Sequence, residues 1–249
     1  VNMDFTGKVA LITGASIGIG ASIAYDLASN KCNVVINYNT SKKEAEHLKE
    51  EVMKKFGVKA ITIKCDVSKE KEVIKMVNEV IKEFGKIDIL VNNAGIAIDS
   101  LVEDKKVEDF RKILDVNLIG TFICSREVAK HMMNQGYGKI INIASTNAID
   151  TYYPCGLDYD ASKAGVISLT HNLAEYYKPY ITVNAVAPGW VNTPMNRELD
   201  KDFIKEECKN IKLGRFAEPI EIAKVVTFLA SKNANYINDA IIRVDGGSR

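Results

Sequence analysis

Short apolar segments alternate with longer amphipathic segments along most of this chain, and this alternation limits the folds that it can adopt. The apolar segments have the length of buried strands, whereas the segments between them carry apolar residues at helical spacing. The predicted strands are 8–12, 33–37, 60–64, 87–91, 139–143, 181–186 and 240–244. Strands that alternate with helices form parallel sheets covered on both faces. We therefore predict an α/β fold with a doubly wound parallel sheet of seven strands.

The predicted helices and loops complete this pattern. Helical spacing is found over 21–28, 44–56, 71–84, 107–133, 159–177 and 219–230. The longest irregular stretches are 146–158 and 190–200. Loops of this length in a compact domain are usually functional, and both are expected to border a crevice at the carboxyl ends of the strands. The chain has 249 residues, of which 47% are hydrophobic, and we expect a single domain over 3–249.

Composition excludes several classes of partner. The 33 basic and 32 acidic residues give a net charge of +1, so no overall field attracts nucleic acid or an anionic membrane. No apolar stretch has the length of a membrane span, and the first residues lack a charged and apolar leader. The five cysteines and three histidines show neither paired metal-ligand spacing nor a disulfide framework. We expect a cytoplasmic protein with small-molecule partners and no metal.

A glycine-rich turn, Thr13 to Gly20, directly follows the first apolar run and precedes a helical pattern. Glycines let the backbone approach a pyrophosphate, and the N-terminus of the next helix offers unpaired N–H groups and partial positive charge. This order favours a nucleotide-phosphate site. An ordinary strand-to-helix turn is the alternative interpretation of the glycines alone.

Tyr159 and Lys163 are separated by one helical turn and share a helix face. A free tyrosine titrates near ~10, so a tyrosine that exchanges protons at neutral pH needs a positive neighbour to stabilise its phenolate. Lys163 supplies that charge. The alternative for the pair alone is a tyrosine and a lysine that cover a helix surface.

With Thr13-Gly14-x-x-x-Gly18-x-Gly20, Asn92-Asn93-Ala94-Gly95, Ser145, Tyr159-x-x-x-Lys163 and Pro188-Gly189 in this order, the chain resembles the short-chain dehydrogenase/reductase family over essentially its whole length. The resemblance implies a Rossmann-type fold, with a cofactor half at about 3–145 and a substrate and lid half at about 146–249. It also implies hydride transfer between a nicotinamide and a carbonyl or secondary alcohol.

The resemblance implies roles for individual residues. Tyr159 is the general acid in reduction and the base in oxidation, Lys163 also binds the nicotinamide ribose, and Ser145 orients the substrate oxygen. Asn117 matches the family asparagine that holds a water beside the lysine, with a simple polar packing contact as the alternative. Asp66 is expected at the adenine, or else as a helix cap. The expected cofactor contacts are Gly14, Ser16, Ile17, Gly18, Ile19, Gly20, Asn37, Tyr38, Asp66, Val67, Asn93, Ala94, Gly95, Tyr159, Lys163, Pro188, Gly189, Val191 and Thr193.

The choice of nicotinamide cofactor depends on the end of the second strand. NAD selection normally uses an acidic residue there, which repels a 2′-phosphate, but this chain has Asn37. NADP selection commonly uses an arginine in the glycine turn, where this chain has Ile17. Since the acidic repulsion is missing and the polar segment 37–42 can surround a phosphate, we favour NADP(H) over NAD(H).

The overall pattern is most like the 3-oxoacyl-(acyl-carrier-protein) reductases. Those enzymes carry arginines that meet the acidic carrier protein, whereas the matching segments 132–138 and 177–180 contain none. A small-molecule carbonyl reductase or alcohol dehydrogenase is therefore the main hypothesis. A 3-oxoacyl thioester reductase of fatty acid synthesis is the alternative, and a non-catalytic nucleotide-binding scaffold is a remote one. Tyr152, Tyr153 and Cys155 either shape a substrate pocket or only pack their loop. The resemblance also implies a homotetramer.

Overall fold

The computed structural model describes residues 3–196 and 199–248 and is built on one parallel sheet. The strand order is β3-β2-β1-β4-β5-β6-β7, and every neighbouring pair is parallel. The strands are β1 (Val9–Ile12), β2 (Asn33–Tyr38), β3 (Ala60–Lys64), β4 (Ile89–Asn92), β5 (Gly138–Ile143), β6 (Ile181–Pro188) and β7 (Ile241–Val244). The predicted α/β fold with a seven-stranded parallel sheet is confirmed.

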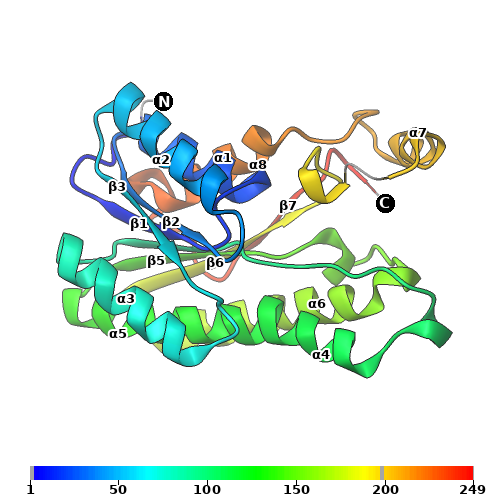
Figure 1. Cartoon of the computed structure of the whole chain (residues 1–249), viewed down its shortest axis with the longest axis horizontal. Helices are drawn as coiled ribbons and strands as arrows, with labels where there is room; N and C mark the ends of the chain where they lie inside the picture. Colours follow the sequence, from blue (N-terminus) through cyan, green and yellow to red (C-terminus); the bar gives the residue numbers. More distant parts are fainter. Residues whose placement is uncertain (1–2, 197–198, 249) are drawn as a thin grey trace.

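Helices cover both faces of the sheet (Figure 1). One face carries α1 (Gly18–Ser29), α2 (Lys42–Phe56) and α8 (Pro219–Ala230). The opposite face carries α3 (Glu70–Phe84), α4 (Val107–Leu114), α5 (Gly120–Gln135) and α6 (Leu157–Tyr177). Because side chains alternate along each strand, Leu11 packs into one core and Ile12 into the other. Burial on both sides explains why the strands are continuous apolar runs.

The order of the strands creates a crevice. After β3 at the edge, the chain crosses to the other side of β1 and forms β4, so Leu11 pairs with Val35 on one side and with Leu90 on the other. At the carboxyl end of the sheet, the chain after β1 continues into α1 on one face, whereas the chain after β4 leads to α4 on the opposite face. In doubly wound sheets, this position is where ligands bind.

Two helical regions differ from the prediction. The expected helix over 107–133 is divided by a π-helical turn, Asp115–Ile119, between α4 and α5. The segment after 200 forms a helix that the sequence did not indicate, α7 (Lys201–Asn210). Asp200 caps α7 by accepting hydrogen bonds from the N–H groups of Asp202 (2.8 Å) and Phe203 (3.2 Å). No residue of α7 is buried, so its sequence lacks the apolar stripe on which helix prediction depends.

Within the described ranges, no helix combines the length and apolar character needed to cross a membrane.

Candidate active site

The glycine turn connects β1 to α1 and depends on the lack of side chains at two positions. Gly14 has φ +59°, and a Cβ there would lie 2.8 Å from the Cα of Ala94. A Cβ on Gly20 would lie 2.4 Å from Nδ2 of Asn93. These distances are shorter than van der Waals contact. The turn therefore packs closely against the chain that leaves β4, and Gly20 contributes to this packing.

Hydrogen bonds join these two segments. The hydroxyl oxygen of Thr13 accepts from the backbone N–H groups of Asn93 and Ala94, each at 3.0 Å. In return, Nδ2 of Asn93 donates to the carbonyls of Thr13 (3.0 Å) and Gly14 (2.9 Å). The floor of the crevice is thus fixed by contacts within the protein.

The N-terminus of α1 opens into this crevice. Its N-cap residue, Ile17, makes no side-chain cap to the first helical N–H groups, and no acidic side chain lies in the first turn. Uncapped N–H groups and the helix dipole together favour an anion at this point. A phosphate group is the expected ligand.

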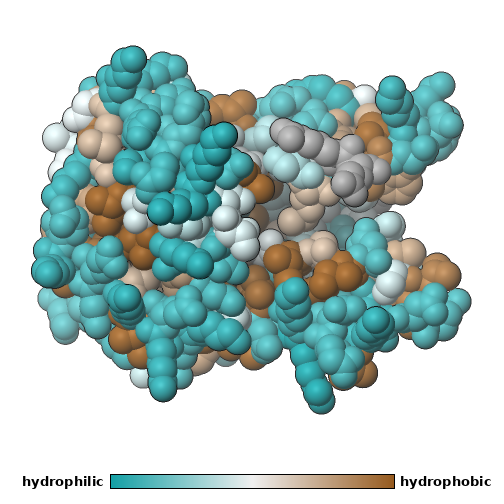
Figure 2. Space-filling model, viewed as in Figure 1, coloured by the Kyte–Doolittle hydropathy of each residue, from teal (hydrophilic) through white to brown (hydrophobic). Residues whose placement is uncertain are grey.

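A cavity of about 980 Å³ lies at the carboxyl ends of the strands, lined by residues that follow β1, β2, β3 and β4. In the space-filling view the surface is hollowed between the parts of the molecule that carry α7 and α4, with hydrophobic residues along the lower wall (Figure 2). Of the expected cofactor contacts, Gly14, Ser16, Ile17, Gly18, Ile19, Asn37, Asp66, Val67, Asn93, Ala94, Gly95, Tyr159, Lys163 and Thr193 line it. This volume is at the upper end of the range found for ligand pockets, and it is large enough for a dinucleotide.

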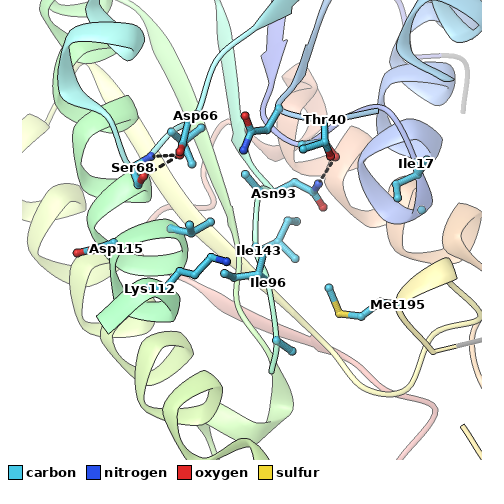
Figure 3. Close-up of a pocket in the computed structure, with 18 of the residues that line it drawn as sticks. Ile17, Thr40, Asp66, Ser68, Asn93, Ile96, Lys112, Asp115, Ile143 and Met195 are labelled. Carbon is cyan, nitrogen blue, oxygen red and sulfur yellow. Dashed lines mark hydrogen bonds between the residues drawn. The ribbon is translucent and has the colours of Figure 1, made fainter. Parts of the chain in front are cut away.

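Figure 3 shows how the two sides of the cavity are arranged, with Ile17 and Met195 on one side and Asp66, Ser68 and Lys112 on the other. Asp66 accepts hydrogen bonds from the backbone N–H (3.0 Å) and hydroxyl (2.7 Å) of Ser68, ahead of α3. It does not bond the first N–H groups of α3, whose N-cap is Lys69. Asp66 therefore lines the cavity and is not a helix cap.

Tyr38 lies elsewhere than expected, and Asn37 makes contacts within the protein that the sequence did not indicate. The side chain of Asn37 is buried, accepting from the N–H of Gly14 (3.0 Å) and donating to the carbonyl of Cys65 (3.1 Å). Tyr38 packs in the core and does not line the cavity. The Asn37 side chain therefore links the glycine turn to the end of β3 while Asn37 still lines the cavity, whereas Tyr38 packs away from it. The polar wall at the end of β2 consists of Asn39, Thr40 and Ser41.

The segment after β6 contributes one expected contact directly. Thr193 lines the cavity and lies close to the start of α1. A Cβ on Gly18 would lie 3.6 Å from Cγ2 of Thr193. Pro188, Gly189 and Val191 do not line the cavity. Gly189 packs against Asp245, and Val191 is buried and forms a β-bridge with Ala217. These three residues support the segment behind Thr193.

The structure brings Tyr159 and Lys163 together at one end of the cavity. The ammonium of Lys163 lies 5.6 Å from the centroid of the Tyr159 ring and donates a hydrogen bond to the carbonyl of Ile143 at 2.7 Å. Lys163 is buried, and this burial lowers its pKa from 10.5 to about 8. Burial raises the pKa of Tyr159 from 10.0 to about 12. At neutral pH Tyr159 is therefore a protonated phenol beside a cationic lysine.

Ser145 lies immediately beyond β5 in extended backbone conformation. Its hydroxyl accepts a hydrogen bond from the N–H of Asn147 at 3.2 Å. A second hydrogen bond, with Tyr159, lowers the pKa of the phenol and so opposes the larger effect of burial. The strand end and the first turns of α6 thus place two hydroxyls and one ammonium together. This arrangement can polarise a carbonyl oxygen and deliver a proton to it.

Asn117 is buried in the π-helical turn between α4 and α5. Its side chain accepts from the N–H of Ile96 (2.8 Å) and donates to the carbonyl of Ile96 and the hydroxyl of Ser162, both at 3.0 Å. A Cβ on Gly95 would lie 3.4 Å from its Oδ1 and 3.6 Å from the ammonium of Lys163. The π-turn therefore places the asparagine beside the lysine, and Gly95 leaves room for both.

Aromatic residues pack around Trp190, in the segment that follows β6. Trp190 stacks on Phe216 with ring centroids 5.4 Å apart, and Phe203 and Tyr153 meet its ring edge-on at 5.6 and 6.5 Å. Tyr152 is 80% exposed, so only Tyr153 of the two loop tyrosines packs here. Phe203 comes from α7 and was missed because that helix was not predicted.

Sequence reasoning also missed the carboxylates that flank Tyr159. Asp160 accepts from Nδ2 of Asn147 (2.8 Å) and from the N–H of Tyr153 (3.1 Å), which fastens the loop after β5 to α6. Asp158 is fully buried and is paired with Lys105. No residue pattern links Lys105 with Asp158, because their contact depends on how the segment that carries Lys105 folds against the first turn of α6.

Comparison with known proteins adds independent evidence. The family model described as "Enoyl-(Acyl carrier protein) reductase" matches residues 14–249. The chain is 44% identical over 242 residues to the protein named 3-oxoacyl-[acyl-carrier-protein] reductase FabG of Staphylococcus epidermidis, covering 96% of this chain and 98% of the relative. It is 35% identical over 248 residues to Glucose 1-dehydrogenase 2 of Bacillus subtilis, covering 98% and 95%.

Solved structures agree closely with the fold. A dehydrogenase/reductase from Sinorhizobium meliloti 1021 superimposes with a TM-score of 0.94 at 34% identity, covering 99% of this chain and 96% of that one. A short chain dehydrogenase from Burkholderia cenocepacia J2315 in complex with NADP superimposes with a TM-score of 0.91 at 32% identity, covering 97% and 98%.

Proposed function

The chain belongs to the short-chain dehydrogenase/reductase family and is a nicotinamide-dependent oxidoreductase, and we propose that it reduces the ketone of a 3-oxoacyl thioester with NADPH. The observation that carries this proposal is the protonated Tyr159, held between Lys163 and Ser145 at the end of a glycine-floored cavity. A phenol that keeps its proton at neutral pH is ready to act as an acid. This state provides the proton that reduction of a carbonyl requires.

The proposed mechanism assigns one task to each group. The nicotinamide, when bound, supplies the hydride that adds to the carbonyl carbon. Tyr159 gives its proton to the carbonyl oxygen as negative charge develops there, and the Ser145 hydroxyl holds that oxygen by a hydrogen bond. Lys163 stabilises the phenolate that Tyr159 becomes. Asn117 fixes the backbone at Ile96 beside Lys163, and solvent returns the proton to Tyr159.

The proposed preference for NADP(H) rests on the wall at the end of β2. Asn39, Thr40 and Ser41 provide polar groups, and Lys69 provides a cation on the same cavity. The end of β2 carries no acidic side chain that would repel a 2′-phosphate, and among the described residues the carboxylates on the cavity are Asp66, Glu108 and Asp115. The Burkholderia relative with bound NADP is consistent with this choice.

The proposed thioester substrate rests on the curated relatives named 3-oxoacyl-[acyl-carrier-protein] reductase. Docking of an acyl carrier protein is not part of this proposal, because basic residues near the segments 132–138 and 177–180 are already paired. Arg126 bonds Glu70 and Glu127, Lys130 pairs with Glu127, and Lys178 with Glu175. Paired cations attract an acidic carrier protein only weakly.

A second candidate substrate is a polyol or sugar. Carboxylates surround the loop before α6: Asp99 accepts a hydrogen bond from Tyr153, and burial raises the pKa of Asp160. Carboxylates accept hydrogen bonds from hydroxyl groups, and one relative is named a glucose dehydrogenase.

Steady-state assays with matched substrates test the proposal. We expect the largest kcat/KM for a short 3-oxoacyl thioester with NADPH, a lower value with NADH, and weak turnover of the free ketone. Oxidation of glucose at a higher kcat/KM than thioester reduction would support the second candidate instead.

We further propose a homotetramer, because apolar side chains are exposed on two helical faces. Ile119, Phe122 and Tyr176 lie exposed on the π-turn, α5 and α6, whereas Ile220 and Phe228 lie exposed on α8. Light scattering coupled to gel filtration measures the mass directly, and a monomer would refute the proposal.

A further inference from the structure

A buried ion pair joins Lys105 to Asp158, which lies in the first turn of α6. The ammonium of Lys105 is 3.1 Å from both carboxylate oxygens of Asp158. The side chains are 5% and 0% exposed, respectively. Burying two charges is unfavourable unless their geometry and further hydrogen bonds compensate for the lost water. General stability alone therefore does not explain why these two charges are buried together.

Asp158 and Lys105 each make a further hydrogen bond, and that of Asp158 is to Tyr159. Oδ1 of Asp158 accepts from the backbone N–H of Tyr159 at 3.0 Å. The N-cap of α6, Gly156, has no side chain to bond the first N–H groups, so Asp158 takes over part of that role. On the other side, Lys105 also donates to the carbonyl of Ile98, in the segment that follows β4.

Two further contacts show that this end of α6 is held from both loops. The N–H of Ser100 donates to the carbonyl of Cys155 at 3.0 Å, which joins the segment after β4 to the turn before α6. Asp160 binds the loop after β5 through Asn147 and Tyr153. Among these contacts, the Lys105–Asp158 pair is the one that ends on the backbone of Tyr159 itself.

We propose that Lys105 and Asp158 are positioning residues, which fix the backbone of Tyr159 relative to the segment that carries Ile96 and Ile98 along the cavity wall. The proposal rests on the proposed function, in which Tyr159 is the acid. A shift of about 1 Å in a reacting group can reduce turnover by about a hundredfold. A rigid link between the cavity wall and the tyrosine backbone prevents such a shift.

Three variants test the pair: Lys105→Met, Asp158→Asn and the double variant. Each single variant leaves one buried charge without its partner, whereas the double variant removes both charges and keeps an oxygen acceptor for the Tyr159 N–H. We expect each single variant to lower kcat by about tenfold or more, with the Kd of NADPH unchanged. The double variant is expected to return to within about threefold of the wild-type kcat.

Lys106→Met is the matched control, because the neighbouring lysine is exposed and makes no ion pair among the described residues. It should leave kcat and the Kd of NADPH unchanged. Thermal unfolding of all four variants identifies any that are unfolded at the assay temperature. A purely structural pair would lower the unfolding temperature and leave the kcat of the folded protein unchanged, which would overturn the proposal.

Hydrogen exchange provides a readout that needs no activity. The peptide spanning 157–163 should exchange faster in each single variant, and at the wild-type rate in the double variant and in Lys106→Met. Unchanged exchange in the single variants would overturn the positioning role, whether or not the protein reduces a thioester. Conversely, an inactive wild-type protein with the expected exchange pattern would overturn the proposed function and leave the positioning of Tyr159 supported.

Discussion

The ammonium of Lys163 lies 5.6 Å from the centroid of the Tyr159 ring, one turn further along α6, and is held there by the carbonyl of Ile143 at 2.7 Å. The end of β5 thus determines where the positive charge sits relative to the phenol. Both groups are deeply placed, so burial acts against each charged form. Because burial shifts the two pKa values in opposite directions, the pH dependence of rate and stability can distinguish Lys163 from Tyr159.

The rate of reduction is expected to fall as the pH rises through about 8. Lys163 has a pKa lowered to about 8 and loses its positive charge there, whereas Tyr159 has a pKa raised to about 12 and keeps its proton. The loss of rate therefore reports the lysine. A pH profile of kcat/KM, which reports groups of the free enzyme, measures it, with Lys163→Arg as the control, because arginine stays charged and removes the inflection. A flat wild-type profile up to pH ~10 would contradict this assignment.

Replacing Lys163 by methionine is expected to stabilise the free protein at neutral pH. The lysine pKa is 10.5 in its ordinary environment and about 8 in the fold, so burying the charge costs roughly 3 kcal/mol at pH 7. Between pH 8 and 10.5 the unfolded chain binds more protons than the folded one, and wild-type stability therefore rises with pH.

Urea unfolding at pH 7 and pH 10 tests this stability prediction. Lys163→Met should be more stable than the wild type at pH 7, by less than the full cost of the buried charge because the carbonyl of Ile143 loses its partner, and this advantage should shrink at pH 10. A variant less stable than the wild type at pH 7 would show that the lysine stabilises the free fold.

Gly14 is expected to be essential for nucleotide binding because of a clash, not because of its backbone angle alone. Gly14 and Gly57 have similar φ values, +59° and +67°, but a Cβ at Gly57 meets nothing within 4 Å. Gly57→Ala should therefore cost only the strain of a left-handed alanine, about 1 kcal/mol. Gly14→Ala should lower the affinity for NADPH by at least about tenfold, measured by fluorescence titration. Equal affinities in the two variants would count against the close packing on Ala94.

Asn117 is expected to affect both stability and turnover. Asn117→Ala leaves the N–H and carbonyl of Ile96 without their partners, which costs about 1–3 kcal/mol. Because Ile96 lines the cavity near Lys163, kcat should fall as well. Asn172→Ala is the control, since its exposed amide bonds only the carbonyl of Ser168. Chemical denaturation and kcat of both variants measure these effects, and a wild-type kcat in Asn117→Ala would limit the residue to a packing role.

Sequence reasoning predicted the parallel sheet and the part of the cavity that follows the strands, because buried strands and glycine turns are recorded in local patterns, but it did not predict the wall that α4 provides. Val9–Ile12 and Gly14 are examples of such local signals. The π-turn at Asn117 could not be predicted, since the apolar spacing continues through it. The burial of the Asn37 amide and the pairing of Lys105 with Asp158 also escaped prediction, because both depend on contacts between segments far apart in the sequence.

The most direct test of the account compares wild-type protein with Tyr159→Phe in one assay, in which absorbance follows NADPH consumption with a short 3-oxoacyl thioester. The phenylalanine keeps the ring but cannot donate a proton. We predict turnover by the wild type and a loss of about a hundredfold to ten-thousandfold in the variant, with the Kd of NADPH unchanged. Turnover in the variant equal to that of the wild type would contradict the role of Tyr159 as the acid.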